Sequence, residues 1–127
     1  MRALLIRSPH IDKILSGKKV WEIRGARTHV RGPVGLIRSG SGSVIGVCDI
    51  VDCYGPLTAE QYRKNARKAG TTPREAILGT YQQTFAWVIK NPRHLKAAIP
   101  YKHPNGAIIW VTLDAKTEKA VLRAQKG

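Results

Sequence analysis

Acidic side chains are scarce in this sequence. Its 127 residues include 8 Asp and Glu against 22 Lys and Arg, which gives a formal net charge of +14. Such an excess does not determine a fold, but it attracts polyanions and speeds their capture. A pI of about 10.4 is typical of a nucleic-acid-binding domain. Two alternatives stay open on charge alone, namely a surface that only keeps the protein soluble and an acidic protein partner.

Residues that bind metals or form disulfides are also few. The two cysteines, Cys48 and Cys53, lie in one expected strand region at an odd separation. They should therefore point to opposite faces, where they cannot bond to each other. We expect both to be small buried side chains in a reducing compartment. A zinc site needs about four ligands at short spacings, and the histidines are scattered at positions 10, 29, 94 and 103. We predict no metal site and no cofactor.

Long apolar runs are missing. The longest, such as residues 107–111, are far too short to span a bilayer. The apolar stretch after Met1 is too short for a signal peptide and has no cleavage-like site. We therefore expect a cytoplasmic protein with no membrane partner. The length suits one domain with its own core, and we take a monomer as the default.

The first part of the chain alternates strands with one short helix. Ser8-Pro9 follows an expected strand over residues 3–6 and supplies an N-cap hydroxyl and a proline for the first helical position. Apolar residues at 11, 14 and 15 form one face of that helix, and Gly17 ends it. Further strands are expected over residues 19–24, 34–37 and 44–51, the last with a bulge or a close backbone approach at Gly46.

The second part is expected to hold helices and then two central strands. Thr58 and Gln61 have the spacing of a capping box, and a second short helix should start at Pro73. Residues 84–89 and 107–113 are apolar on both faces, as in central strands, with an irregular basic connection between them. The tail, residues 114–127, either forms a helix with Val121 and Leu122 inward or frays. This order predicts an α+β fold, a small mixed β-barrel of about five to six strands with helices on its rim.

The densest polar cluster lies at residues 17–24. Glu22 and Arg24 are neighbours on one face of the expected strand, and Lys18 or Lys19 sits at the turn that leads to that face. A pocket floor is one interpretation, because arginine offers a fixed fork and lysine a point charge to an anion. A surface salt bridge, which contributes about 0–1 kcal/mol, is the other. The residues alone leave both open.

This stretch resembles the signature of ASCH domains, which belong to the PUA-like superfamily. The signature has a short strand (residues 3–6), a helix that ends in Gly-x-Lys (residues 17–19) and a strand that carries Glu-x-Arg (residues 22–24). The resemblance covers roughly residues 1–113 and leaves 114–127 outside. It implies a cleft between a small barrel and the first helix, with Lys19, Glu22 and Arg24 lining it. It also implies single-stranded or modified RNA as the ligand, in preference to DNA.

Some members of this family resemble enzymes that deacetylate acetylcytidine with a lysine, a threonine and a downstream glutamate. Lys19 matches the lysine, but Glu22 stands at the threonine position, and residues 66–70 contain no acid for the third. We therefore predict negligible hydrolysis of acetylcytidine. Other ASCH proteins resemble ribonucleases, and that alternative stays open.

Three functions remain open: an RNA-binding module without catalysis, a hydrolase acting on RNA or nucleosides, and an adaptor for an acidic protein. His103 lies in a loop, and a histidine side chain there could act as a general acid or base. Tyr101 is the best candidate for stacking on a base. If the protein is an enzyme, the catalytic candidates are Lys19, Glu22 and His103. The candidate RNA-binding residues are Arg7, Ser8, His10, Lys18, Lys19, Glu22, Arg24, Tyr101 and Lys102.

Overall fold

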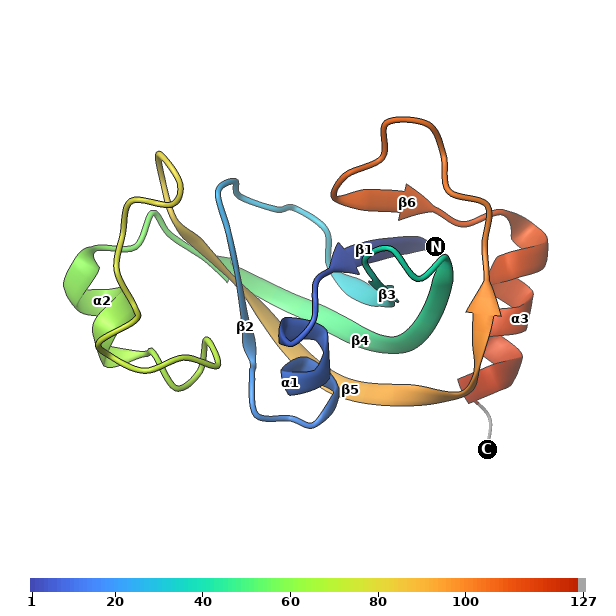
Figure 1. Ribbon diagram of the computed structural model, residues 1–127, viewed down its shortest axis with the longest axis horizontal. Helices are drawn as coiled ribbons and strands as arrows, with labels where there is room; N and C mark the ends of the chain where they lie inside the picture. Colours follow the sequence, from blue (N-terminus) through green and yellow to red (C-terminus); the bar gives the residue numbers. More distant parts are fainter. Residues whose placement is uncertain (126–127) are drawn as a thin grey trace.

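The computed structural model describes residues 1–125, in which six strands form one curled sheet with helices around it (Figure 1). The strands are β1 (Arg2–Ile6), β2 (Trp21–Arg24), β3 (Gly32–Arg38), β4 (Ser43–Tyr54), β5 (Phe85–Pro100) and β6 (Trp110–Thr112). The helices are α1 (His10–Leu15), α2 (Ala59–Lys64) and α3 (Ala115–Gln125). The strand order is β2-β5-β4-β3-β1-β6. The expected α+β fold with a barrel-like sheet of five to six strands is confirmed.

Two long neighbouring strands, β4 and β5, make the middle of the sheet. Residues 90–100 were expected to be irregular, and this is wrong because β5 continues to Pro100. Opposite β4, the pairing shifts between Val47 and Asp49, whose partners are Arg93 and Lys90. Two residues of β5, Asn91 and Pro92, therefore lie opposite the single residue Cys48 of β4. This one extra residue makes a bulge, and a bulge tolerates the missing N–H of proline.

The expectation of a central strand over residues 107–113 is also wrong. The strand there, β6, has three residues and pairs only with β1, at the edge of the sheet. The apolar residues of this stretch do not all face the core. Val111 and Leu113 are buried in the core, whereas Ile108 and Ile109 are exposed.

Gly46 confirms the expected bulge and close approach. The β4–β5 register shifts between Val44 and Gly46. A Cβ atom at Gly46 would lie 2.5 Å from Leu15 Cδ2 and 3.0 Å from the Arg93 carbonyl oxygen. The missing side chain therefore lets α1 rest directly on the middle of the sheet.

The two cysteines are free and buried, as expected. They do not lie in separate layers, however, because both belong to the core cluster that contains Leu4 and Ile50. The register shift between Ile50 and Asp52 changes the alternation of β4 between Cys48 and Cys53. Burial raises the pKa of Cys48 to about 12.

The start of α1 differs from expectation. The N-cap residue is Pro9 and no side chain caps the helix, because the Ser8 hydroxyl instead accepts a hydrogen bond from Arg38. Arg38 also donates two hydrogen bonds of 2.8 Å to the Asp12 carboxylate. The helix ends as expected, with Gly17 at a φ of +82°.

The segment after α2 contains turns where a second helix was expected. The Thr58–Gln61 capping box is present at the start of α2. From Pro73 onward, turns replace the expected helix, and the Thr72 hydroxyl bonds locally to Glu75. Short local bonds of this kind compete with helix formation.

The tail forms α3, which packs on β5 (Figure 1). Val121 is fully buried in the second core cluster, as expected, but Leu122 is exposed. Residues 126–127 of the expected tail lie outside the described residues. No helix within residues 1–125 has the length and apolar character needed to cross a membrane.

Candidate functional site

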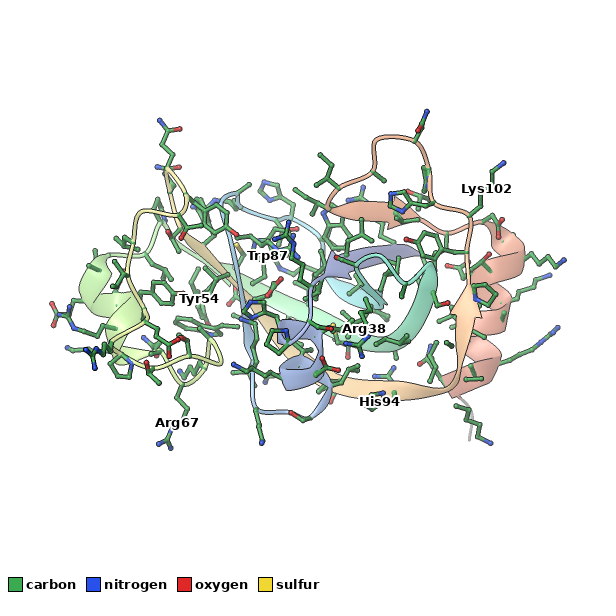
Figure 2. All side chains as sticks on the ribbon, viewed as in Figure 1. Arg38, Tyr54, Arg67, Trp87, His94 and Lys102 are labelled. Carbon is green, nitrogen blue, oxygen red and sulfur yellow. The ribbon has the colours of Figure 1, made fainter. Side chains whose placement is uncertain are left out.

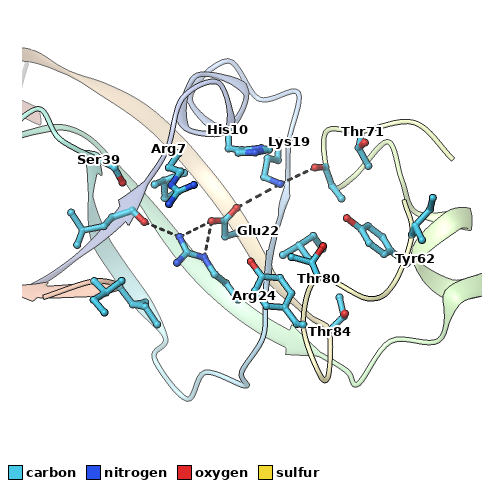
Figure 3. A pocket seen from close by; sticks show the side chains of 18 residues that line it. Arg7, His10, Lys19, Glu22, Arg24, Ser39, Tyr62, Thr71, Thr80 and Thr84 are labelled. Carbon is cyan, nitrogen blue, oxygen red and sulfur yellow. Dashed lines mark hydrogen bonds and ion pairs between the residues drawn. The ribbon is translucent and has the colours of Figure 1, made fainter. Parts of the chain in front are cut away.

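A cavity of about 530 Å³ opens between α1, β2 and the irregular segment that precedes β5 (Figure 3). Its floor comes from β2 and the end of β1, and residues 108–109 border its other side. The charged residues that line it are Arg7, Lys19, Glu22 and Arg24, with His10 beside them. Glu22 is the single carboxylate in the described lining. The cavity is therefore basic, with one acid at its centre.

Glu22 and Arg24 point to the same face of β2, as the strand alternation predicted. Arg24 Nε donates to Glu22 Oε2 over 2.9 Å, and Arg24 Nη2 lies 2.8 Å from the same oxygen. Arg24 Nη2 also donates to the Leu5 carbonyl over 2.8 Å, and the guanidinium lies 5.7 Å from the centroid of the Trp87 ring. These contacts fix the guanidinium on the cavity floor.

Glu22 is buried and Arg24 is largely buried, as a pocket floor requires. The side chains of Glu22 and Arg24 are 7% and 17% exposed. This burial excludes the simple surface salt bridge that the residues alone had left open. Removal of one partner would leave a charge in a place that water reaches poorly.

Lys19 completes the charged floor. Its Nζ donates to the Ala69 carbonyl over 2.7 Å and lies 3.5 Å from Glu22 Oε1. Burial lowers the pKa of Lys19, and the negative charge of Glu22 acts in the opposite direction. Gly70 covers the aliphatic part of the side chain, where a Cβ atom would lie 3.1 Å from Lys19 Cβ. The segment after α2 therefore holds Lys19 in place.

Two more of the expected residues line the cavity near α1. Arg7 and His10 are both exposed. Partial desolvation of its ring by the cavity is the main cause that lowers the pKa of His10, followed by the positive charge of Lys19. His10 is therefore more readily neutral than a fully solvated histidine.

Tyr62 of α2 and residues of the segment after α2 supply a wall that the sequence did not reveal. Hydroxyl and aromatic side chains line it, namely Tyr62, Thr71, Thr80, Tyr81 and Thr84. The Tyr81 ring lies against Gly25, where a Cβ atom would meet it at 2.7 Å. Burial raises the pKa of Tyr62. The one sequence signal was the cluster of threonines and tyrosines in a stretch without regular periodicity.

The other candidates lie elsewhere in the molecule. Ser8, Lys18, Tyr101, Lys102 and His103 are not among the described residues that line the cavity. The Tyr101 hydroxyl lies 2.8 Å from His103 Nδ1, and His103 Nε2 lies 2.9 Å from the Ala107 carbonyl oxygen. Tyr101 also packs against the second core cluster. Figure 2 places Lys102 at the end of the molecule opposite Arg67.

The described residues offer no obvious place for a metal ion. Within residues 1–125, no three His, Cys, Asp or Glu side chains gather closely enough to ligate one. What the cavity does offer is cationic groups for an anion, and hydroxyl and carboxylate oxygens for the polar edge of a flat ligand.

The comparisons with known proteins agree on one family. The ASCH domain family matches residues 4–98. The crystal structure of ASCH from Zymomonas mobilis is similar in fold, with a TM-score of 0.73 at 12% identity over 96% of this chain and 93% of that one. A mutant form of the same Zymomonas mobilis protein, with one tyrosine replaced by phenylalanine, gives a TM-score of 0.72 at 13% identity, with 96% of each chain covered. Among curated proteins, no relative matches this chain. Because the family match covers well over half of the sequence, this chain belongs to the ASCH domain family, within the PUA-like superfamily.

Proposed function

We propose that this ASCH domain binds RNA, single-stranded or carrying a modified nucleoside, in the cavity above Lys19, Glu22 and Arg24. The observation behind this proposal is a cavity of about 530 Å³ whose charged lining has three Lys and Arg side chains and one carboxylate. Pockets of roughly 300–1,000 Å³ suit small organic ligands, and a nucleotide combines that size with negative charge. The net charge of +14 would attract such a polyanion from a distance.

The fixed Arg24 is the central donor in this proposal. Its Nε and Nη2 atoms are held by Glu22 and Leu5. Within residues 1–125, Nη1 has no hydrogen-bond partner and can donate to a phosphate or a base oxygen. Arg7, at the exposed side of the cavity, supplies a second cation. Because these donors are already positioned, binding requires little ordering of side chains.

The wall formed by α2 and the segment after it suits a nucleobase. Tyr62 and Tyr81 provide aromatic surface, and Thr71, Thr80 and Thr84 provide hydroxyls that donate or accept. A base can reach such a cavity only when it is not paired and stacked in a helix. Single-stranded RNA or an extruded nucleoside therefore fits better than a duplex.

The test compares two exposed arginines. Arg7 lines the cavity, whereas Arg63 is an exposed residue of α2 outside its lining. We expect Arg7→Gln to weaken binding of a random-sequence eight-nucleotide RNA about tenfold, as loss of a charged hydrogen bond does. Arg63→Gln should change the dissociation constant less than about twofold. Fluorescence anisotropy with labelled RNA at physiological salt measures both.

Equal effects of Arg7→Gln and Arg63→Gln would mean diffuse attraction to charge and would contradict the cavity as the site. An absence of RNA binding at physiological salt would favour the adaptor for an acidic protein partner.

A second candidate function is hydrolysis of RNA or a nucleoside, and Lys19 is the observation that favours it. A buried amine with a lowered pKa, 3.5 Å from a carboxylate, is a typical proton-transfer pair. Incubation of RNA with the wild type and with Lys19→Met, followed by analysis of fragments, tests it. Turnover that the substitution abolishes supports an enzyme. Equal, background-level cleavage by both supports a module that only binds.

Acetylcytidine is expected to survive incubation with the protein. Glu22 stands where the deacetylating enzymes have their threonine. The segment that covers Lys19 contributes Ala69 and Thr71 to the cavity but no acid. Chromatography of the nucleoside after incubation measures this. Turnover well above background that is lost in Lys19→Met would show that the missing groups are not required.

A further inference from the structure

A second, shallower groove lies between the loop after β2 and the edge strand β6. Its volume is about 410 Å³, and its lining residues are Arg2, Arg27, Thr28, His29, Val30 and Trp110. Figure 1 shows this loop, residues 25–31, rising from β2 and arching toward β6. No carboxylate is among the described residues of the lining. The groove therefore combines two permanent cations, a histidine and one large aromatic ring.

The floor of the groove is already formed. Trp110 stacks on Trp87, with ring centroids 5.7 Å apart and an interplanar angle of 10°. Trp87 Nε1 donates to the Ala26 carbonyl over 2.8 Å and so ties the loop to the sheet. Trp110 is only partly buried, because as an edge-strand residue it is covered on one side.

The loop is held in shape as well. Thr28 is buried, and its hydroxyl accepts a hydrogen bond from the Val30 N–H over 3.1 Å. Arg31 Nη1 donates to the Thr28 and Val30 carbonyls over 3.0 and 2.8 Å. Arg31 is thus used to support the loop, and Arg2 and Arg27 are the arginines that line the groove.

The two arginines are placed around Trp110. Arg2 lies opposite Thr112 in the β1–β6 pair, which makes Trp110 its diagonal neighbour on the same face. The Arg27 guanidinium lies 5.0 Å from the centroid of the Phe85 ring, and its Nη2 donates to the Gly55 carbonyl over 2.8 Å. Its other nitrogens have no hydrogen-bond partner within residues 1–125.

The groove and the first cavity share a wall. Ile109 lines the cavity and the next residue, Trp110, lines the groove. Arg24 lines the cavity and Arg27, three residues later, lines the groove. Trp87 contacts both Arg24 and Trp110. The two sites are therefore neighbours, and Glu22 is the one carboxylate among their described lining residues.

We propose that this groove is a second nucleotide subsite, in which a base stacks on Trp110 and the adjoining phosphates meet Arg2 and Arg27. It rests on the proposed function, since the occupant is the continuation of the RNA strand held in the first cavity. An aromatic platform flanked by cations is the combination that holds single-stranded nucleic acid with little sequence preference. The first cavity then selects the nucleotide, and the groove adds affinity for the strand.

The test measures how affinity depends on RNA length. Random-sequence RNAs of two and eight nucleotides are titrated against the full chain by anisotropy. We expect the wild type to bind the longer RNA at least about tenfold more tightly, because stacking of one further base adds roughly 5- to 150-fold. The double variant Arg2→Gln/Arg27→Gln should lose most of that gain. The slope of the logarithm of its RNA affinity against the logarithm of salt concentration should become less steep by about 1.4. Two phosphate contacts are lost, and single strands release about 0.7 counterion per contact.

The matched control removes the same charge elsewhere. Lys116→Gln/Lys119→Gln alters two exposed residues of α3 and should keep the length-dependent gain. Tryptophan fluorescence gives a second measurement, which reports directly on stacking at Trp110. RNA should quench tryptophan emission, and Trp110→Phe, which keeps a ring on Trp87, should reduce that quenching.

Three outcomes would overturn the groove as a nucleotide subsite. If both double variants behave alike while Arg7→Gln still weakens binding, the first cavity stands and the groove proposal is wrong. If Arg7→Gln has no effect, the two sites do not share a strand, and the proposal is overturned together with the proposed function. An unchanged quenching amplitude in Trp110→Phe also overturns the stacking role.

Discussion

Glu22 balances the charges on the cavity floor. It contacts Lys19 through Oε1 and Arg24 through Oε2, and its side chain is 7% exposed. Two cations held by one buried carboxylate leave this part of the fold sensitive to the loss of that carboxylate. The same arrangement keeps a net positive charge available to a ligand.

The first prediction concerns the stability that Glu22 provides. Glu22→Gln should lower the free energy of unfolding by about 3 kcal/mol, because Lys19 and Arg24 would remain charged and buried without a counter-charge. Urea denaturation followed by circular dichroism measures this change. The control is Asp12→Asn, which removes the exposed partner of Arg38 and should cost less than about 1 kcal/mol. Equal losses would mean that the floor is well hydrated.

Lys19 gives a pH-dependent prediction. Its pKa is lowered in the fold from 10.5, so between the lowered pKa and about 10.5 the unfolded chain binds more protons at this group. Stability contributed by Lys19 should therefore rise as the pH increases through that window. The measurement is the free energy of unfolding of the wild type minus that of Lys19→Met, taken at about pH 8, 9 and 10. If this difference in unfolding free energy falls as the pH rises, the attraction of Glu22 for the Lys19 ammonium outweighs the effect of burial on its pKa.

At the scale of elements, α3 is tied to the sheet at more than one point. Its Val121 is buried in the cluster that contains Ala3 and Leu5, and Glu118 lies 2.6 Å from the N-terminal amine of Met1. Asp114 Oδ1 accepts a hydrogen bond from the Thr117 N–H over 2.8 Å at the start of the helix. Although the family match ends at residue 98, α3 packs as part of the same unit.

Two neighbouring substitutions in α3, Val121→Ser and Leu122→Ser, test whether the helix is coupled to the folded core. Val121 is 0% exposed and Leu122 is 46% exposed. Val121→Ser should lower the free energy of unfolding by about 2–3 kcal/mol, through lost apolar burial and an added hydroxyl in the core. Leu122→Ser should change it by about 0.5 kcal/mol or less. If neither substitution matters in urea denaturation, α3 is not coupled to the folded core.

At the scale of the whole molecule, charge is far from balanced. Five ion pairs are present among the described residues, and one of them uses the N-terminal amine. Most of the Lys and Arg side chains within residues 1–125 therefore have no acidic partner. Such an excess favours capture of polyanions and at the same time makes the folded state repel itself.

Salt should therefore move stability and RNA affinity in opposite directions. Between about 20 and 300 mM NaCl, a range that shortens the screening length several-fold, the melting temperature should rise because self-repulsion is screened. RNA affinity should fall, with a log–log slope of about −2.8 if Arg2, Arg7, Arg24 and Arg27 each meet one phosphate. Calorimetry and anisotropy measure the two trends. A slope near zero would contradict phosphate contacts as the source of affinity.

The sequence by itself determined the parts of the fold that depend on local patterns. Alternation along β2 put Glu22 and Arg24 on one face, and the glycine at position 17 ended α1. The capping box at Thr58 and the bulge at Gly46 were likewise readable, because each requires a particular residue type at a fixed position. The fixed spacing of the Gly-x-Lys and Glu-x-Arg motifs was enough to indicate the family.

Only the tertiary structure decided which distant residues share a site. It brought Tyr62, Thr71 and Tyr81 against β2 and left Tyr101 and His103 bonded to each other outside the cavity. It also placed Arg2 and Arg27, far apart in the chain, around Trp110. Bulges shifted the phase of β4 and carried β5 through Pro92, and such shifts depend on the partner strand. The physical reason is that periodicity reports how a segment meets its immediate neighbours, whereas a cavity depends on contacts between segments that local sequence does not specify.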